Sequence, residues 1–334
     1  MTECEATEKD DLQESTEALA ALRIQIPPSQ VTSSCKYKLT ELVQERKGHS
    51  CEVYRGVWTA KHTYYIKHNS PVIIKRVFHH DTANSEIHIL QKLMHKTNPL
   101  QDFFVKLVHV ACYPGMINDL ILEDGGDDVF MHFAHHYPFR DYSDEAFTIR
   151  VKHLSYVMSH VVECVLKLHL LGFVHNDIKP ENAVIDNTPS QRVRLIDFST
   201  CTRNAYVSNY DIHFMNGDQV GSEFFIHPAL VWERPILLFH NDWWAVGQFA
   251  WTLYTNLELY NPSRTTVYER NRILDSFLHG DTWTLEPTLP PSLRDHPSFP
   301  LFASFVTSMC CETQCPSSPS MLLLQHPFLC YWKT

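Results

Sequence analysis

The sequence FVHNDIKPENAVIDNTPSQRVRLIDFST, residues 173–200, contains the most informative pattern in the chain. Two short, mostly apolar runs at 183–185 and 193–196 have the length and composition of strands. Asp, Asn, Thr, Pro and Ser lie between them, and these residue types favour turns. The segment therefore predicts a β-hairpin.

Three oxygen-bearing side chains flank this hairpin. Asp177 and Asn182 lie on the loop before the first strand, and Asp197 directly follows the second. Paired strands would bring all three side chains to one edge. Carboxylate and amide oxygens suit Mg²⁺, which shares its remaining sites with water and phosphates, and a carboxylate that binds no metal can accept a proton from a hydroxyl. The alternative is a loop whose polar residues occur by chance.

The motifs HNDIKPEN and DFS within this segment resemble the HRDLKPEN and DFG motifs of the eukaryotic protein kinases. The resemblance implies that Asp177 orients the substrate hydroxyl and that Lys179 neutralises the transferred phosphoryl group. It also implies that Asn182 and Asp197 hold Mg²⁺. A lysine two residues after the aspartate is typical of Ser/Thr kinases. The implied cofactors are ATP and Mg²⁺, and the implied partner is a protein with a Ser or Thr acceptor.

The same resemblance implies an α+β fold with two lobes. The small lobe would be an antiparallel β-sheet with one helix, called αC in the family, and the larger lobe would be mainly α-helical. His175 and Phe198 match a column of stacked apolar side chains that ties the lobes together. Asp242, in the segment NDWWAVG, matches a buried carboxylate that receives N–H groups from the catalytic loop. Strands are expected at 53–58, 72–75, 105–110 and 120–123, and helices at 82–94 and 147–170.

The segment VIIK ends at Lys75, which matches the lysine that contacts ATP phosphates in the family. Glu86, on the predicted helix, would pair with Lys75 and hold it in place. The short interval between the two predicts a tight loop before that helix. Ile73 replaces a smaller alanine and would narrow the adenine slot. The alternatives are an ordinary strand lysine and a solvated helix glutamate.

The nucleotide-covering loop departs from the family pattern GxGxxGxV. When Val53 is aligned with the pattern's valine, the three glycine positions hold Arg46, Gly48 and Cys51. Glycine lets the backbone lie close over phosphates. We therefore expect a looser cover and weaker catalysis.

The hinge between the lobes is expected after the strand at 120–123. Backbone groups of Glu123 to Gly125 would meet the adenine edge, with Leu122 as the gatekeeper at the back of the slot. Asp127 and Asp128 could favour basic substrates at the cleft mouth. We favour a solvated acidic turn for these two residues.

Further departures concern regulation. Asn176 replaces the arginine that usually binds a phosphorylated activation loop, and an asparagine has no charge to pair with phosphate. Activity should therefore not require phosphorylation of that loop. Ser199 replaces the DFG glycine. Ala229 replaces a buried glutamate, and its usual arginine partner is missing from 311–320, so the two losses compensate.

Composition bounds the class of protein. The chain has 334 residues, 44% of them hydrophobic, and a formal net charge of −10, which argues against a nucleic-acid partner. Its ten cysteines form no zinc-binding pattern, and no leader or membrane span is recognisable. These features predict a cytoplasmic and/or nuclear protein with reduced thiols.

The domain organisation follows from these assignments. Residues 1–36 are acidic and poor in apolar mass, which predicts a disordered tail that could dock a partner. Residues 37–334 form the kinase domain, with a small lobe at 37–122, the hinge at 123–128 and a large lobe at 129–334.

Two functions remain open. The first is a Ser/Thr protein kinase that moves the γ-phosphoryl group of ATP to protein hydroxyls. The second is a pseudokinase, a binding or scaffolding module with weak or no transfer. The altered loop, Ile73, Asn176 and Ser199 favour the second, whereas the residues that contact phosphate or metal favour the first. A small-molecule kinase on the same fold is a third, less favoured option.

Overall fold

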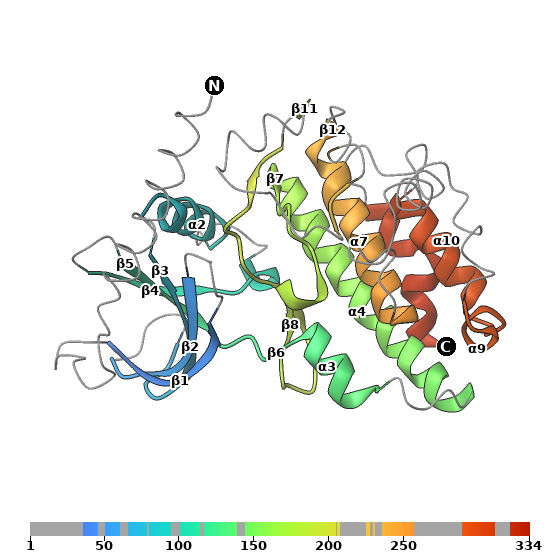
Figure 1. Cartoon of the computed structure of the whole chain (residues 1–334), viewed down its shortest axis with the longest axis horizontal. Helices are drawn as coiled ribbons and strands as arrows, with labels where there is room; N and C mark the ends of the chain where they lie inside the picture. The colour runs from blue at the N-terminus through green and yellow to red at the C-terminus, as the bar shows by residue number, and fades with distance from the viewer. Residues whose placement is uncertain are drawn as a thin grey trace, which may run out of the picture.

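The computed structural model describes residues 36–45, 51–60, 66–78, 80–94, 101–113, 117–138, 144–204, 206–207, 225–227, 230, 236–256, 289–310 and 321–334. Our predictions for the tail before residue 36, for Arg46 and Gly48, for Ala229 and for residues 311–320 lie outside the described residues. Figure 1 shows a β-sheet with helix α2 on one side of the molecule and a group of helices on the other.

The small lobe is an antiparallel sheet in the order β1-β2-β3-β5-β4. Its strands are β1 (Tyr37–Glu45), β2 (Cys51–Trp58), β3 (Pro71–Val77), β4 (Leu107–Tyr113) and β5 (Ile117–Glu123). The predicted strands at 53–58, 72–75 and 120–123 are confirmed. The one predicted at 105–110 begins two residues late because the N–H of Val105 bonds instead to Leu195 O, at 3.3 Å.

Side chains alternate across β3 because successive residues of a strand point to opposite faces. Val72 and Ile74 are fully buried in a small core on one face, with Trp58 and Ile121. Ile73 and Lys75 therefore face the opposite side, towards the large lobe.

A buried ion pair also belongs to the small lobe. Arg76 donates two hydrogen bonds to Asp119, at 2.8 and 2.9 Å, and Tyr37 Oη donates a third to the same carboxylate, at 2.6 Å. Asp119 is fully buried, so this carboxylate depends on its three donors in place of water.

Helix α2 (His80–Leu93) packs against the sheet through Ala83, Leu90 and Leu93. It starts two residues earlier than the predicted 82–94, after the short connection that the sequence indicated. Glu86 lies on its inner face and is 1% exposed.

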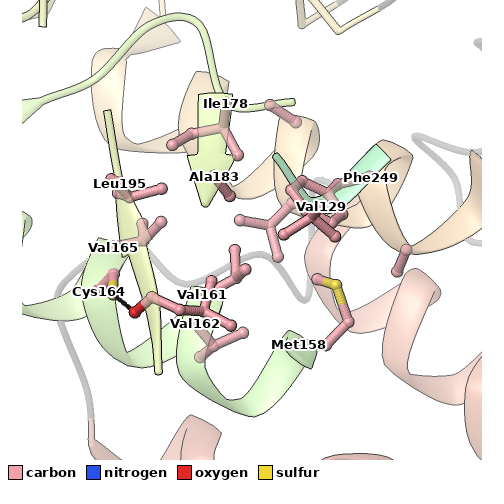
Figure 2. Packing of buried hydrophobic residues seen from close by; sticks show 14 of the residues in the cluster. Val129, Met158, Val161, Val162, Cys164, Val165, Ile178, Ala183, Leu195 and Phe249 are labelled. Carbon is pink, nitrogen blue, oxygen red and sulfur yellow. Dashed lines mark hydrogen bonds between the residues drawn. The ribbon is translucent and has the colours of Figure 1, made fainter. Parts of the chain in front are cut away.

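Helix α4 (Asp144–Leu170) forms the centre of the large lobe and confirms the helix predicted at 147–170. Figure 2 shows its side chains Val161 and Val165 packed with Ala183 and Leu195 of the hairpin in one apolar cluster. That hairpin consists of β8 (Ala183–Ile185) and β9 (Val193–Leu195), which pair antiparallel as predicted.

The remaining elements complete the large lobe. They are α3 (Val129–His136), α7 (Leu238–Thr255), α9 (Pro291–Arg294), α10 (Phe299–Cys310), the strands β6 (Asp127–Asp128), β7 (Phe173–Val174), β10 (Thr202–Arg203), β11 (Tyr206–Val207) and β12 (Ile236–Leu237), and the 3₁₀ helices η2 (Gln101–Phe103), η3 (Pro180–Asn182), η5 (Met321–Gln325) and η6 (Pro327–Lys333). In the part of the chain that is described, no helix has the length and apolar character needed to cross a membrane.

The acidic turn that we favoured at Asp127 and Asp128 is wrong. The two residues form β6, which pairs with β8, and both are half-buried. Asp128 is also the N-cap of α3, since its Oδ1 accepts a hydrogen bond from Met131 N at 2.8 Å. Pairing with β8 attaches this segment to the large lobe, so the free connection between the lobes is limited to residues 124–126.

The last described segment packs across the middle of α4. Ser155 Oγ donates to Phe328 O at 2.6 Å and accepts from Trp332 N at 3.1 Å. Ser155 is fully buried beneath this contact, and the Tyr156 ring meets Trp332 edge to face. Segment 327–332 therefore forms part of the wall of the large lobe.

Candidate active site

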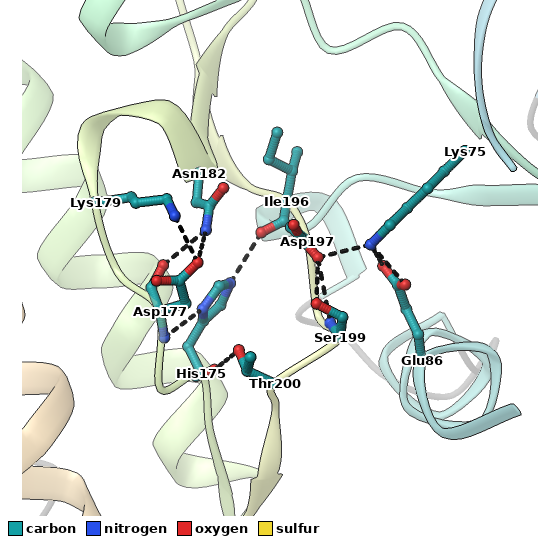
Figure 3. Close-up of polar contacts among 10 residues, drawn as sticks. All are labelled: Lys75, Glu86, His175, Asp177, Lys179, Asn182, Ile196, Asp197, Ser199 and Thr200. Carbon is teal, nitrogen blue, oxygen red and sulfur yellow. Dashed lines mark hydrogen bonds and ion pairs between the residues drawn. The ribbon is translucent and has the colours of Figure 1, made fainter. Parts of the chain in front are cut away.

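Lys75 lies at the centre of a charged cluster that joins both lobes (Figure 3). Its Nζ donates to the two carboxylate oxygens of Glu86, at 3.0 and 2.8 Å, and to Asp197 Oδ1, at 2.7 Å. Lys75 comes from β3, Glu86 from α2, and Asp197 from the segment after β9 in the large lobe. The arrangement holds the ammonium group where it can meet a phosphate at the interlobe surface.

The electrostatics keep Lys75 protonated. Burial by itself would lower the pKa of Lys75, but the carboxylates of Asp197 and Glu86 outweigh it and hold that pKa above its usual range. Burial raises the pKa of Glu86, an effect that the charge of Lys75 opposes. One lysine thus balances two carboxylates that have little contact with water.

A second cluster lies across the cleft on the loop between β7 and β8. Lys179 Nζ is 2.8 Å from Asp177 Oδ2. Asn182 Nδ2 donates to the same oxygen at 2.7 Å and to the backbone oxygen of Asp177 at 2.8 Å. Pro180 begins η3 with the backbone geometry of a helical turn, which places Asn182 back over Asp177. The Asp177 carboxylate is therefore fixed in orientation.

Asp242, on α7, supports this loop from below. Its Oδ2 accepts from His175 N and its Oδ1 from Asn176 N, both at 2.8 Å. His169 Nε2 lies 2.9 Å from Oδ2. Asp242 is fully buried, so its lone pairs are directed to these protein donors. The residue occupies the supporting position that the sequence indicated.

His175 and Phe198 form part of a column of rings between the loop and the small lobe. Their ring centroids are 5.2 Å apart, and Phe198 meets Phe104 edge to face at 5.9 Å. His175 Nε2 donates to Ile196 O at 2.9 Å, which ties the loop to the residue before Asp197.

Two residues of the site have left-handed backbone conformations. Asn176 has φ = 66° and Asp197 has φ = 60°. Asparagine and aspartate tolerate this region better than most residues, and such conformations cluster at functional sites. The Ser199 hydroxyl donates to Asp197 Oδ1 at 2.7 Å, the oxygen that also accepts from Lys75. The residue in place of the DFG glycine is thus a direct contact of the predicted metal ligand.

Asn176 makes neutral contacts in place of an arginine's charge. Its Nδ2 donates to Thr200 O and to Thr202 Oγ1, both at 3.0 Å. Thr200 Oγ1 in turn donates to His175 O at 2.9 Å. The residues after DFS are therefore attached to the catalytic loop without a phosphate group.

A cleft of about 1280 Å³ lies between the two clusters. It is lined by most of the predicted nucleotide-binding and metal-binding residues: Val53, Ile73, Lys75, Glu86, Leu122, Glu123, Gly125, Lys179, Asn182 and Asp197. Gly48, the remaining predicted nucleotide contact, lies outside the described residues.

Several apolar side chains that line the cleft were not predicted from the sequence. They are Val43, Val105, Phe130, Met131, Val184 and Ile196. Val184 and Ile196 lie in the predicted hairpin beside Asn182 and Asp197, so strand alternation could have identified them. A Cβ on Gly125 would lie 2.5 Å from Val184 Cγ2, which explains glycine at that position. The N–H of Glu123 bonds to Lys106 O at 2.9 Å, so the adenine contact that we predict for residues 123–125 would fall to the other backbone groups of this segment.

The donor set fits Mg²⁺. Asp197 offers a carboxylate, and Asn182 directs its amide nitrogen to Asp177, which leaves its amide oxygen on the other side of the group (Figure 3). In the described segments, no three His, Cys, Asp or Glu side chains converge as a complete metal site. An ion held by Asn182 and Asp197 would take its remaining oxygens from water and phosphate, as Mg²⁺ does with nucleotides.

Comparison with known proteins agrees with this geometry. The protein kinase domain family matches residues 46–329. Smooth muscle myosin light chain kinase of Gallus gallus is 28% identical over 114 residues, which cover 34% of this chain and 6% of that protein. Maternal embryonic leucine zipper kinase of Xenopus laevis is 31% identical over 93 residues, covering 28% of this chain and 13% of the relative.

The Ser/Thr protein kinase ppk15 of Schizosaccharomyces pombe is 29% identical over 141 residues, covering 40% of this chain and 24% of that protein. The matches thus span less than a quarter of the length of each of these three relatives. The family match, by contrast, extends over most of this chain and includes both clusters and the cleft between them. The chain belongs to the protein kinase domain family.

Proposed function

We propose that this protein is a Ser/Thr protein kinase, which transfers the γ-phosphoryl group of Mg-ATP to hydroxyl groups of a protein substrate. The observation that carries the proposal is the intact bridge between the lobes. Lys75 contacts Glu86 and Asp197 at once, at 2.7 to 3.0 Å. Phosphoryl transfer depends mainly on positioning and charge, so this arrangement supplies what the reaction requires.

Each residue of the two charged clusters has a defined task in this proposal. Lys75 binds the nucleotide phosphates, held in place by Glu86. Asp177, fixed by Asn182 and Lys179, orients the acceptor hydroxyl and accepts its proton, while Lys179 neutralises the transferred group. Asn182 and Asp197 would hold Mg²⁺, which would neutralise negative charge on the nucleotide phosphates.

Phosphate transfer from labelled ATP to a degenerate peptide library would test the proposal directly. We expect transfer to Ser- and Thr-containing peptides, and a loss of about 100-fold or more in Asp177→Asn, because the general base is removed. Asp295→Asn is the matched control, since the Asp295 side chain is 67% exposed. Equal transfer by wild type and Asp177→Asn would refute the assignment.

A pseudokinase is the second candidate, and specific observations favour it. Ser199 replaces glycine and bonds to Asp197, and Ile73, which replaces a smaller alanine, lines the cleft. A thermal-shift measurement with ATP, in the presence and absence of Mg²⁺, separates the candidates when it is combined with the transfer assay. Stabilisation by Mg-ATP without Asp177-dependent transfer would support the scaffold.

The choice of substrate and compartment belongs to the same proposal. The lysine at position 179 and the named Ser/Thr kinases among the relatives support Ser and Thr as acceptors. The cysteines of the described segments are free thiols, which supports a cytoplasmic or nuclear protein. Immunofluorescence of the tagged full chain tests the compartment.

A further inference from the structure

A second ion pair joins the two lobes. Arg194, on β9 of the large lobe, donates through Nη1 to Glu123 Oε1, at the end of β5 in the small lobe. Their side chains are only 12% and 18% exposed. The same glutamate oxygen accepts from Lys106 N at 3.1 Å, and Glu123 N donates to Lys106 O at 2.9 Å. Glu123 is therefore held on two sides, by Lys106, the residue before β4, and by Arg194 on β9.

The strand that carries Arg194 leads directly to the metal-binding end of the site. Leu195 O accepts from Val105 N at 3.3 Å, and Ile196 N donates to Asn182 O at 3.0 Å. Asp197 follows. Glu123 lines the cleft, whereas Arg194 is not among the lining residues. The pair thus connects the hinge with the segment that presents Asp197, without occupying the space for a nucleotide.

The neighbouring charges leave Glu123 as the close partner of Arg194. Lys106 Nζ is paired with Asp102 at 2.9 Å, and this hydrogen bond, with smaller contributions from the charges of Arg192 and Arg194, lowers the pKa of Asp102. Arg192 is exposed, whereas Arg194 is largely shielded from water. An ion pair in such surroundings is screened little by solvent, and the loss of one partner leaves the other charge poorly compensated.

We propose that the Arg194–Glu123 ion pair is an interlobe clamp that fixes the hinge for nucleotide binding, which makes Arg194 a positioning residue for a ligand it does not contact. The clamp limits how far the hinge can open at residues 124–126. It also fixes the position of the adenine side of the cleft relative to Asp197. The part of this inference that concerns ATP rests on the proposed function. The part that concerns the hinge does not.

The test uses the full chain with three variants and one control. Arg194→Met removes the charge, Arg194→Lys retains it, and Glu123→Gln removes the partner's charge but keeps an acceptor for Lys106 N. Arg192→Met is the matched control on the same segment. We expect Arg194→Met to weaken binding of a fluorescent ATP analogue with Mg²⁺ by roughly fivefold or more, with Arg194→Lys close to wild type.

Two further readouts distinguish a positioning role from a loss of stability. The double variant Arg194→Met/Glu123→Gln should bind no more weakly than Arg194→Met alone, because both changes break one contact. Amide hydrogen exchange of the nucleotide-free protein should speed up at 104–107 and 120–126 in Arg194→Met and stay unchanged in Arg192→Met.

Each remaining outcome is decisive. Unchanged affinity and unchanged exchange in Arg194→Met overturn the clamp, as does additive weakening in the double variant or an equal effect of Arg192→Met. A lower melting temperature with unaltered affinity reduces Arg194 to a structural role and also overturns it. If the wild type binds no nucleotide, the proposed function fails, and hydrogen exchange alone still decides whether the hinge is clamped.

Discussion

Replacing Lys75 by Met would remove the one positive charge that separates two shielded carboxylates. Glu86 is 1% exposed at its side chain and Asp197 is 18% exposed, and both currently accept hydrogen bonds from Lys75. Removal of one partner of a buried ion pair costs about 3–5 kcal/mol, because an uncompensated charge remains. We expect Lys75→Met to lower the free energy of unfolding by about that amount at pH 7.

The pH dependence and a second substitution identify the cause. Burial raises the pKa of Glu86, and without Lys75 that effect is opposed mainly by a backbone hydrogen bond from Phe198, so Glu86 takes up a proton more readily as the pH falls. The deficit of Lys75→Met relative to wild type should therefore be smaller at pH 5.5 than at pH 7. The double variant Lys75→Met/Glu86→Gln should recover most of the loss, since the amide needs no counter-charge.

Urea unfolding followed by tryptophan fluorescence measures these differences, with wild type and Glu86→Gln as references. A change within about 0.5 kcal/mol for Lys75→Met, the range of ordinary surface substitutions, would refute the reasoning. A double variant less stable than Lys75→Met alone would also refute the reasoning, because the uncompensated charge of Glu86 would then not be the cause of the lost stability.

Three further predictions follow from the described contacts. Because Asn176 holds the residues after DFS without phosphate, replacing the Ser and Tyr residues within 205–222 by Ala and Phe should leave peptide turnover within roughly twofold of wild type, and a large loss would contradict this. Asp119→Ala should lower the free energy of unfolding by about 3–5 kcal/mol, most of it regained when Arg76 is also changed to Met; an additive double variant would count against it. Burial, with the charge of His240, lowers the pKa of His227 to about 3, so the unfolded chain binds a proton that the folded chain does not between about pH 6.5 and pH 3. Stability should therefore fall on acidification below about pH 6, by about 1.4 kcal/mol per pH unit from this residue, and His227→Gln should remove that contribution in urea titrations.

Local sequence patterns predicted most of the secondary structure at the centre of the large lobe. The hairpin at 183–195 was recognisable because turn residues separate two short apolar runs, and α4 because its apolar residues recur at helical spacing. Helix α3 was missed since Asp127 and Asp128 suggest a solvated turn, whereas one pairs in a strand and the other caps a helix. The same carboxylate chemistry serves a turn or a cap, and only the partner segment decides between them.

The candidate site also contains one part that the sequence predicts and one part that it does not. Asp177, Lys179 and Asn182 lie within one short motif, so their chemistry is visible in the sequence. The contact between Arg194 and Glu123 joins residues that are 71 positions apart, and neither has a pattern that indicates the other. Such long-range pairs depend on how two lobes meet, which local periodicity does not encode.

The packing of segment 327–332 across α4 has a consequence for the order of assembly during protein synthesis. Ser155 is buried by a carbonyl that is 173 residues further along the chain, so this surface of α4 has no cover while the intervening residues are being translated. The large lobe can close only after that segment has left the ribosomal tunnel. Until then this apolar surface of α4 is exposed, and we expect the nascent large lobe to be a client of chaperones.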